Sequence, residues 1–567
     1  MSERPHSSTG SESVVTASGF RTAPDPNETG WPGGVPYIIG NEACERFSFY
    51  GMKAILQAHL TILFAAQMLA TKGSELLPAE QELAEANAQH MGHLFMAAVY
   101  ATPMIGAIIA DRLLGKYRTI MWLSLVYCAG HAVLAVGENS VVGMAIGLGL
   151  IAIGSGGIKP CVSANVGDQF GRGNNHLVQK VFQWFYFSIN FGSFFSTLII
   201  PLLNRHYGPS VAFGLPGVLM FIATILFWMG RRKFIHVPPN PGGKLGLLDS
   251  VSSLLLFLGL MGIPMFFAEF LGTVGWVIAS VVCVGTGLYV FKVRQGIKAD
   301  NGFLSIMLHS AEAFSNGGNK AAAAEARQNP DAEDIQKNFF FASAAKKFGP
   351  EVAEGPLAVL RILSVFFLVS VFWALFDQHA TSWVRQAQEM DLIVWSYELD
   401  ASQISAMNAL MVMMLIPLNN YLFYPGIEKL GYRLTSLRKM TIGMGTAAFA
   451  FVAAAVLQML IDNAGPGKVP VLWQVVQYLI MTQAEVMVSI TGLEFAYTQA
   501  PKTMKSTVMG FWLLSVSFGN ILVAVLSRFE SLTLQNFFWV FAGLMALASI
   551  LFAVFAMFYK YRDYSKT

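Results

Sequence analysis

Charged residues are scarce in this sequence. Asp, Glu, Lys and Arg make up 13% of its 567 residues, roughly half of the fraction typical of a water-soluble domain, whereas 54% of the residues are hydrophobic. The four cysteines lie within or at the ends of apolar segments and have no paired spacing, so neither a disulfide framework nor a zinc site is implied. No Gly-rich loop ends in Gly-Lys-Ser/Thr, so ATP-driven activity is not supported. The composition therefore places the chain in a bilayer.

The sequence also lacks the side-chain groupings of an enzyme. No Ser/His or paired-Asp arrangement of the kind that an intramembrane enzyme needs is present, so we expect no enzymatic activity. The Gly-rich stretch 147–157 lies inside an apolar span with no preceding strand, and we interpret it as a site of close helix packing and not of nucleotide binding. We expect no nucleic-acid partner.

Apolar runs of membrane-spanning length occupy most of the chain. Roughly fourteen candidate spans of about twenty residues are present. They include 120–136, 141–153, 211–229, 254–267, 274–291, 442–460 and 537–559. The first thirty residues are rich in Ser, Thr, Gly and Pro and contain no apolar core of the kind a signal peptide needs. The pattern predicts an all-α integral membrane protein with a disordered tail over residues 1–30.

Basic residues gather in alternate connections between the spans, which orients the chain. These connections contain Arg112, Lys116 and Arg118; Arg231, Arg232 and Lys233; Lys429, Arg433, Arg438 and Lys439; Lys502 and Lys505; and Lys560, Arg562 and Lys566. The positive-inside rule makes these connections, and hence both termini, cytoplasmic. The sequence then divides into a bundle of about six spans at 31–235, an inserted hairpin at 244–296, a polar cytoplasmic linker at 297–355, a second bundle at 356–560 and a tail at 561–567.

Two bundles joined by a cytoplasmic linker resemble the major facilitator architecture, in which the binding site lies at the midplane between the halves. The segment Gly106-x-x-x-Ala110-Asp111-Arg112-x-x-Gly115-Lys116-x-Arg118 is similar to a short cytoplasmic motif of that superfamily. A weaker echo runs from Gly431 to Lys439 in the second half. The alternative is that these basic residues serve only as determinants of topology.

The first span contains four ionisable residues, namely Glu42, Glu45, Arg46 and Lys53. Each costs about 2.5 to 3.5 kcal/mol at the centre of a membrane helix, so they must face partners or water. At about 100° per residue, Arg46 lies roughly 40° and Lys53 roughly 20° from Glu42, so the three share a face that should line a cavity. A carboxylate whose cationic partner is taken by an anionic ligand becomes easier to protonate. The alternative is a purely structural network of buried charges.

The sequence resembles the proton-coupled oligopeptide transporter family along three stretches. The family pattern E-x-x-E-R-F-x-Y-Y-G matches from Glu42 to Gly51, with Phe49 in place of a tyrosine. A second signature covers 185–193, and a third covers 485–506 and is similar to animal members. The inserted hairpin is similar to that of bacterial members. The resemblance implies a monomeric symporter in a bacterial inner membrane that imports di- and tripeptides with protons by alternating access, with no other cofactor.

The resemblance also implies roles for particular residues. A peptide is a zwitterion, so its carboxylate needs a cation and its ammonium group needs an anion, here Glu485. The implied substrate-binding residues are Arg46, Tyr50, Lys53, Tyr100, Lys159, Tyr186, Asn190, Trp373, Asn408, Glu485, Ser489 and Trp512. The aromatic members of this set would form tolerant pocket walls, with ordinary helix packing as the alternative reading.

Proton coupling is assigned on the same resemblance. The implied coupling residues are Glu42, Glu45, Arg46, His93, Lys159 and Asp377, with Asp377 as the partner of Lys159. His93 is similar to a second-helix histidine of animal members, and an imidazole titrates near physiological pH. Two alternatives remain for His93: a polar residue at the helix end, or a metal pair with His90. For the whole chain the alternatives are a member adapted to another small anionic or zwitterionic solute, and a peptide sensor that does not transport.

Overall fold

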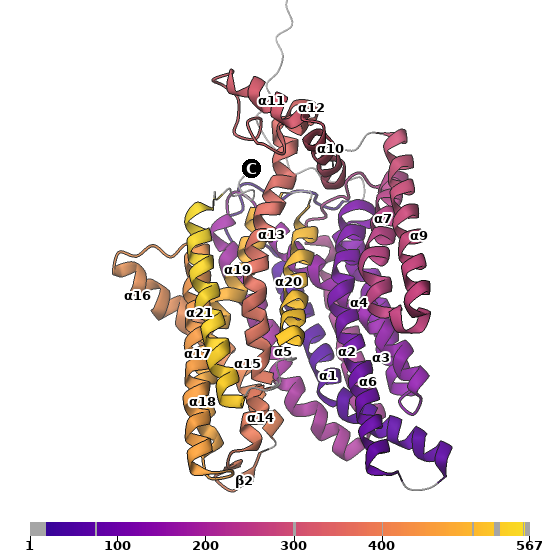
Figure 1. Cartoon of the computed structure of the whole chain (residues 1–567), viewed down its shortest axis with the longest axis vertical. Coiled ribbons are helices and arrows are strands. Elements are labelled where there is room, and N and C mark those ends of the chain that lie inside the picture. Colours follow the sequence, from indigo (N-terminus) through magenta and orange to yellow (C-terminus); the bar gives the residue numbers. More distant parts are fainter. Residues whose placement is uncertain are drawn as a thin grey trace, which may run out of the picture.

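The computed structural model of the chain is built almost entirely of helices (Figure 1). It describes residues 19–73, 76–298, 302–380, 382–399, 401–501, 504–526, 533–559 and 561. Within these residues, thirteen helices are long and apolar enough to cross a membrane, and a shorter apolar stretch at Val508–Gly519 belongs to a further helix. The expected all-α membrane fold is confirmed.

The N-terminal half packs around its first and fourth helices. Its helices are α1 (Val35–Lys72), α2 (Pro78–Ile109), α3 (Lys116–Val136), α4 (Val141–Asp168), α5 (Val178–Tyr207) and α6 (Pro209–Met229). α1 packs against α5 and α6, and α4 packs against α2 and α3. A Cβ atom added to Gly106 would lie 2.2 Å from the carbonyl oxygen of Gly157, so only glycine fits this crossing of α2 and α4. The small residues of 147–157 therefore serve close helix packing.

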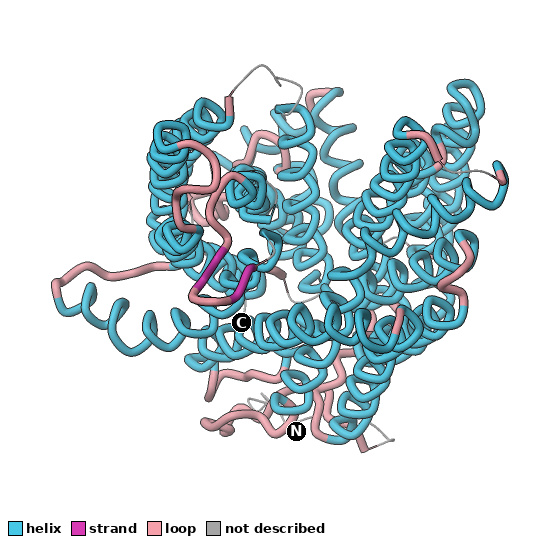
Figure 2. The backbone as a smooth tube through the Cα atoms, turned by 90° about the horizontal axis from the view of Figure 1, so that it is seen from below, coloured by secondary structure: helices cyan, strands magenta, loops and turns pink. Residues whose placement is uncertain are grey.

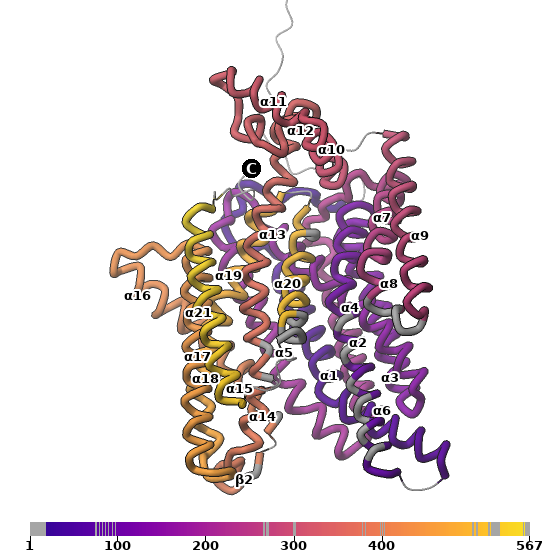
Figure 3. Tube along the Cα trace, in the orientation of Figure 1, coloured from indigo at the N-terminus to yellow at the C-terminus, as the bar shows by residue number. Residues whose placement is uncertain are grey.

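The C-terminal half lies beside the N-terminal half, as the sequence colours of Figure 3 show. Its helices are α13 (Pro350–Phe376), α14 (Ser382–Gln388), α15 (Ala406–Leu418), α16 (Tyr424–Lys429), α17 (Ser436–Ala464), α18 (Gln474–Glu485), α19 (Thr491–Gln499), α20 (Lys505–Leu526) and α21 (Leu534–Phe558). A π-helical turn joins α18 to α19, and another joins α15 to α16. The halves meet where α2 and α4 pack against α20 and where α5 packs against α15.

An inserted hairpin and a helical linker separate the halves. The hairpin consists of α7 (Gly243–Phe257), α8 (Ile263–Phe266) and α9 (Ala268–Ile297), and the linker carries α10 (Phe303–Ser315), α11 (Gly318–Arg327) and α12 (Ala342–Phe348). The linker helices lie at one end of the molecule, at the top of Figure 1, which we call the linker side. Figure 2 views the molecule from the opposite end, the far side, where strands β1 (Ile393–Val394) and β2 (Tyr397–Glu398) form an antiparallel ribbon.

The linker has a small hydrophobic core of its own, which its polar composition does not predict. Ile306, Ile335 and Phe341 pack together with alanines of α12 and with Ala353 at the start of α13. The linker is therefore an extension of α13 and not an unstructured tether.

Residues 19–30 differ from the expected disordered tail. The backbone amide of His236 donates to the carbonyl of Arg21 at 2.8 Å, and the side chain of Asn174 donates to the carbonyl of Gly30 at 2.9 Å. A Cβ atom on Gly173 would lie 2.6 Å from the carbonyl oxygen of Glu28, so this glycine lets the segment approach the loop after α4. Residues 1–18 of the expected tail lie outside the described residues.

Candidate functional site

A cavity of about 440 Å³ lies between the two halves. Ligand pockets usually measure about 300 to 1,000 Å³, so the cavity suits a small organic molecule. Its polar and aromatic lining includes Glu42, Arg46, Tyr50, Lys53, Tyr100, Lys159, Tyr186, Asn190, Trp373, Asn408, Glu485 and Trp512. The first eight of these residues come from α1, α2, α4 and α5, and the rest come from α13, α15, α18 and α20. A ligand in this cavity would therefore touch both halves at once.

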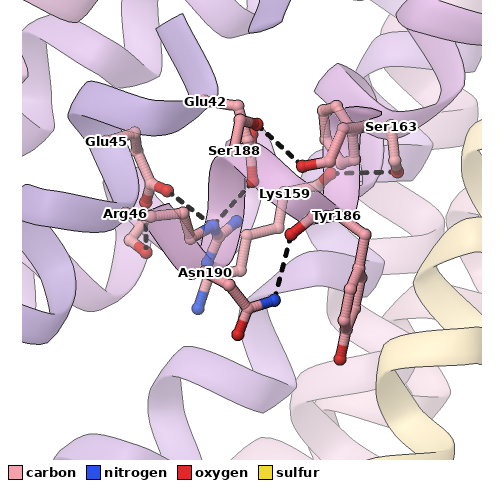
Figure 4. A network of polar contacts seen from close by, with 10 residues as sticks. Glu42, Glu45, Arg46, Lys159, Ser163, Tyr186, Ser188 and Asn190 are labelled. Atoms are coloured by element: carbon pink, nitrogen blue, oxygen red, sulfur yellow. Dashed lines mark hydrogen bonds and ion pairs between the residues drawn. The ribbon is translucent and has the colours of Figure 1, made fainter. Parts of the chain in front are cut away.

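The charged face of α1 forms one wall of the cavity (Figure 4). The Nε atom of Arg46 lies 2.6 Å from Oε1 of Glu42 and 3.0 Å from Oε2 of Glu45. The hydroxyl of Ser155 on α4 donates to the other oxygen of Glu45 at 3.3 Å. One buried guanidinium thus serves two buried carboxylates. A ligand anion that drew Arg46 away would leave both carboxylates without their cationic partner.

Lys159 extends from α4 into the same cavity. Its ammonium nitrogen lies 4.1 Å from the centre of the Phe49 ring and 5.5 Å from that of Tyr100. Aromatic faces attract cations, by about 2 kcal/mol or more at desolvated sites. The ring face of Phe49 provides this contact without a hydroxyl. The departure from the family tyrosine therefore leaves the cation contact in place.

The opposite wall carries Glu485, a buried carboxylate at the end of α18. One carboxylate oxygen accepts a hydrogen bond from the hydroxyl of Tyr186, and the other accepts from the side-chain amide of Asn408 at 2.7 Å. Tyr186 belongs to α5 of the other half, so this hydrogen bond crosses between the halves. A π-helical turn, Val486–Ile490, follows Glu485 directly, and such turns occur frequently at functional sites. Both of these partners are neutral donors, which leaves the carboxylate suited to a ligand cation.

Aromatic rings close the cavity between these charges. The indole rings of Trp373 and Trp512 meet edge to face, with centres 5.9 Å apart. The edge of the Trp512 ring contacts α19 closely at Gly492, where an added Cβ atom would lie 2.0 Å from the ring. The indole nitrogen of Trp373 is buried and has no hydrogen-bond partner in the described part of the chain. Such walls accept apolar side chains of varied shape.

A second buried charge cluster joins the halves on the linker side of the cavity. Asp168 lies nine residues beyond Lys159 on α4, about 13 Å along the helix. Its carboxylate lies 2.8 Å from the ammonium of Lys116 and 3.8 Å from that of Lys505, and it accepts a hydrogen bond from Tyr497 at 3.1 Å. Lys505 also lies over the ring of Tyr497, 3.7 Å from its centre. We call these four residues the linker-side seal.

Toward the far side, the cavity lining continues to His379 and Ser405. His379 lies in the turn after α13, and Ser405 lies just before α15, both at the far ends of their helices. The cavity thus extends toward the far side, while the seal stands between it and the linker side.

A sequence model of the POT family matches residues 117–261 and 268–540 of the chain. The chain belongs to the POT family. It is 31% identical over 480 residues to human "Solute carrier family 15 member 2", an alignment that covers 82% of this chain and 54% of the human protein. The POT-family chain thus spans about half the length of this human relative.

Solved structures of POT-family proteins share the fold along nearly the whole chain. The crystal structure of the POT family transporter PepTSo is 39% identical, has a TM-score of 0.65, and covers 93% of this chain and 98% of its own. The crystal structure of an auto-inhibited POT family peptide transporter is 36% identical, has a TM-score of 0.64, and covers 94% and 98% of the two chains. The major facilitator architecture expected from the sequence is therefore confirmed.

The structure brings together most of the residues singled out in this POT-family sequence. Of the others, Glu45 stands behind Arg46 and outside the cavity lining, and Ser489 is buried in the π-helical turn after Glu485, also outside the lining. The side chains of His93 and Asp377 lie outside the described residues.

Sequence reasoning missed His379 and the linker-side seal. His379 follows Asp377 by two residues, and its imidazole Nδ1 lies 2.5 Å from the carbonyl of Phe376. Its position directly after an apolar span was the available signal. The signal for the seal was Lys116 within the motif that begins at Gly106, together with Asp168, the one carboxylate of α4, which stands at the end of that helix.

Proposed function

We propose that this protein is a proton-coupled symporter that carries di- and tripeptides across a membrane by alternating access. The observation that carries the proposal is the pair of opposed charged walls, with Arg46 and Lys159 in the N-terminal half and Glu485 in the C-terminal half of one cavity. A peptide without charged side chains has one carboxylate and one ammonium group at fixed ends. Arg46 and Lys159 take the carboxylate, and Glu485 takes the ammonium group.

The peptide backbone and side chains use the neutral part of the lining. Asn190 and Asn408 carry amides that both donate and accept hydrogen bonds, which matches a peptide group. The tryptophans and tyrosines accept side chains through their ring faces and do not select one shape. This combination supports a tolerant importer of short peptides over a carrier of inorganic anions, which would have no use for Glu485.

Proton coupling follows from competition for Arg46. When the peptide carboxylate binds the guanidinium, Glu42 and Glu45 lose part of their contact with Arg46, and one of them takes a proton. Charge in the buried network is then conserved, because the added anion is matched by the added proton. We include His93, Lys159 and Asp377 in this coupling group, and we propose that no cofactor beyond the proton is needed.

The linker side is proposed to be cytoplasmic and the far side external. Arg231, Arg232 and Lys233 after α6 and Arg438 in the first turn of α17 lie at the linker side, which agrees with the positive-inside rule. Both termini are then cytoplasmic, and the membrane is a bacterial inner membrane in which the protein acts as a monomer. In this orientation the seal at Asp168 is closed to the cytoplasm while the cavity faces outward. Release of the peptide requires the seal to open.

Uptake of labelled dialanine into proteoliposomes tests the proposal. With an inward proton gradient and a negative interior potential, dialanine should accumulate above its outside concentration, and a protonophore should abolish the accumulation. A protein that binds dialanine without accumulating it would be a peptide sensor. A protein that accumulates another solute but not dialanine would be a family member of different specificity. Either result overturns the proposal.

A further inference from the structure

The inserted hairpin carries an ion pair that is buried against the N-terminal half. Arg294 on α9 donates from Nε to Oδ1 of Asp249 on α7 at 2.6 Å, and its Nη2 lies 3.4 Å from the other oxygen. Arg294 is 2% exposed and Asp249 is 7% exposed. Charges buried among membrane helices are costly and usually functional. A hairpin that served only as peripheral packing would not need them.

Asp249 also faces a second cation, which belongs to the transport core. The Nη1 atom of Arg112 lies 3.8 Å from Oδ2 of Asp249. Arg112 stands in the π-helical turn Ala110–Leu114, between α2 and α3. The carboxylate of Asp249 therefore lies between an arginine of the hairpin and an arginine of the loop.

The backbone of the hairpin entrance reinforces this contact. The amide of Asn240 donates to the carbonyl of Asp111 at 2.9 Å, and the amide of Gly242 donates to the carbonyl of Arg112 at 3.1 Å. The Arg112 side chain donates back to the carbonyl of Asn240 at 3.2 Å. A Cβ atom on Gly246 would lie 1.9 Å from the Arg112 carbonyl oxygen, so α7 meets the loop with no room for a side chain. The loop is thus fixed to the hairpin by backbone and side chains together.

The other end of the same loop holds the linker-side seal. Lys116 follows Arg112 by four residues, and its ammonium pairs with Asp168, which in turn accepts from Tyr497 of the C-terminal half. The residues of the π-helical turn also contact α20. The short segment from Arg112 to Lys116 therefore contacts the hairpin at one end and the interface between the two halves at the other.

We propose that the hairpin restrains the transport cycle through the contacts between Asp249, Arg294 and Arg112, which we call the clamp. Asp249 is a positioning residue that holds Arg112 and thereby keeps Lys116 aligned with Asp168. The clamp stabilises the arrangement that is sealed on the linker side. The inference rests on the proposed alternating access, because it assigns the hairpin an effect on the equilibrium between sealed and open states. It does not depend on which solute is carried.

Two variants release the clamp in different ways. Arg112→Gln removes the cation of the loop and leaves the Asp249–Arg294 pair intact. The double variant Asp249→Asn with Arg294→Gln removes the partner of Arg112 without leaving a lone buried charge in the hairpin. Lys244→Gln, an exposed cation at the start of α7, is the matched control. If the double variant fails to fold, Arg112→Gln alone decides the outcome.

Spin-label distances across the linker side measure the effect. Labels at Arg232→Cys and Arg433→Cys, two exposed positions on different halves, are placed in the full chain after replacement of its four native cysteines. We expect the long-distance population to rise roughly two- to fivefold in both clamp variants, the effect of losing a partly exposed ion pair. We expect no change in Lys244→Gln.

The outcomes separate this inference from the proposed function. An unchanged distance distribution in the clamp variants, or an equal change in Lys244→Gln, overturns the clamp. The expected shift in a protein that does not accumulate dialanine supports the clamp and counts against peptide transport. To separate the clamp from loss of stability, initial uptake of dialanine is normalised to the amount of folded protein in the vesicles; the normalised maximal rate should change in the clamp variants with little change in KM.

Discussion

Replacing Glu485 with glutamine should abolish recognition of the peptide amino terminus while preserving the cavity. The amide has nearly the same volume as the carboxylate, and its oxygen still accepts the hydrogen bond from Tyr186. The substitution removes the negative charge that faces the ligand. It also replaces the oxygen that accepts from Asn408 with an amide nitrogen, so the Asn408 amide must turn to present its own oxygen. The variant should therefore fold normally, with an unfolding midpoint close to that of the unchanged protein.

The size of the effect follows from the burial of the site. Glu485 is 3% exposed, so an ammonium group bound there is largely removed from water. A hydrogen bond to a charged group contributes about 1.5 to 3 kcal/mol, and each 1.4 kcal/mol corresponds to about a factor of ten in affinity. Dialanine should therefore bind the Glu485→Gln variant roughly ten- to hundredfold more weakly.

Isothermal titration of the detergent-solubilised protein provides the assay, with N-acetyl-dialanine as the matched ligand. The acetylated peptide has no ammonium group, so it should bind the unchanged protein weakly and should respond little to Glu485→Gln. Equal losses for both ligands would mean that the substitution damages the cavity in general. No loss for dialanine would remove Glu485 from the binding site.

Three further substitutions test the other parts of the site. Glu42→Gln should retain the exchange of dialanine between equal concentrations inside and outside the vesicles. It should lose accumulation driven by a pH gradient, because an amide cannot carry the proton. Retained accumulation would exclude Glu42 from coupling. Phe49→Leu removes the ring beside Lys159 and should lower the free energy of unfolding, measured by chemical denaturation, by at least about 0.5 to 2 kcal/mol. Phe49→Tyr keeps the ring and should not lower it. An equal loss in both variants would show that the ring face is not the relevant contact. Asp168→Asn leaves the buried Lys116 without the carboxylate that it contacts, a change that costs about 3 to 5 kcal/mol in buried pairs. Spin labels across the linker side should therefore report the open state. An unchanged distance distribution would contradict the assignment of the seal.

The architecture could be predicted because a bilayer makes hydrophobic length and charge placement decisive. The run lengths gave the spans, and the basic connections divided them into two halves and a hairpin. The linker helices α10–α12 escaped prediction because their composition is polar and Ala-rich and their core is only a few residues around Phe341. Residues 19–30 were misjudged for a related reason, since their order comes from loops distant in sequence that glycines such as Gly173 leave open.

The candidate site was predictable where its residues share one helix or stand alone in an apolar span. Helical spacing placed Glu42, Arg46 and Lys53 on one face, and Glu485 was conspicuous as a lone charge. The hydrogen bond between Tyr186 and Glu485 joins residues 299 positions apart, so no local pattern could reveal it. Asp168 was missed because an aspartate at the end of a span is expected to face water, whereas here Lys116 and Tyr497 enclose it.

Simultaneous measurement of peptide entry and lumen pH tests the central claim most directly. Vesicles containing the protein and a trapped pH-sensitive dye, clamped at a negative interior potential with no initial pH gradient, receive external dialanine. The account predicts that labelled dialanine enters and the lumen acidifies together, and that Glu42→Gln abolishes the acidification. Entry of dialanine at the same rate with no change in lumen pH would contradict it.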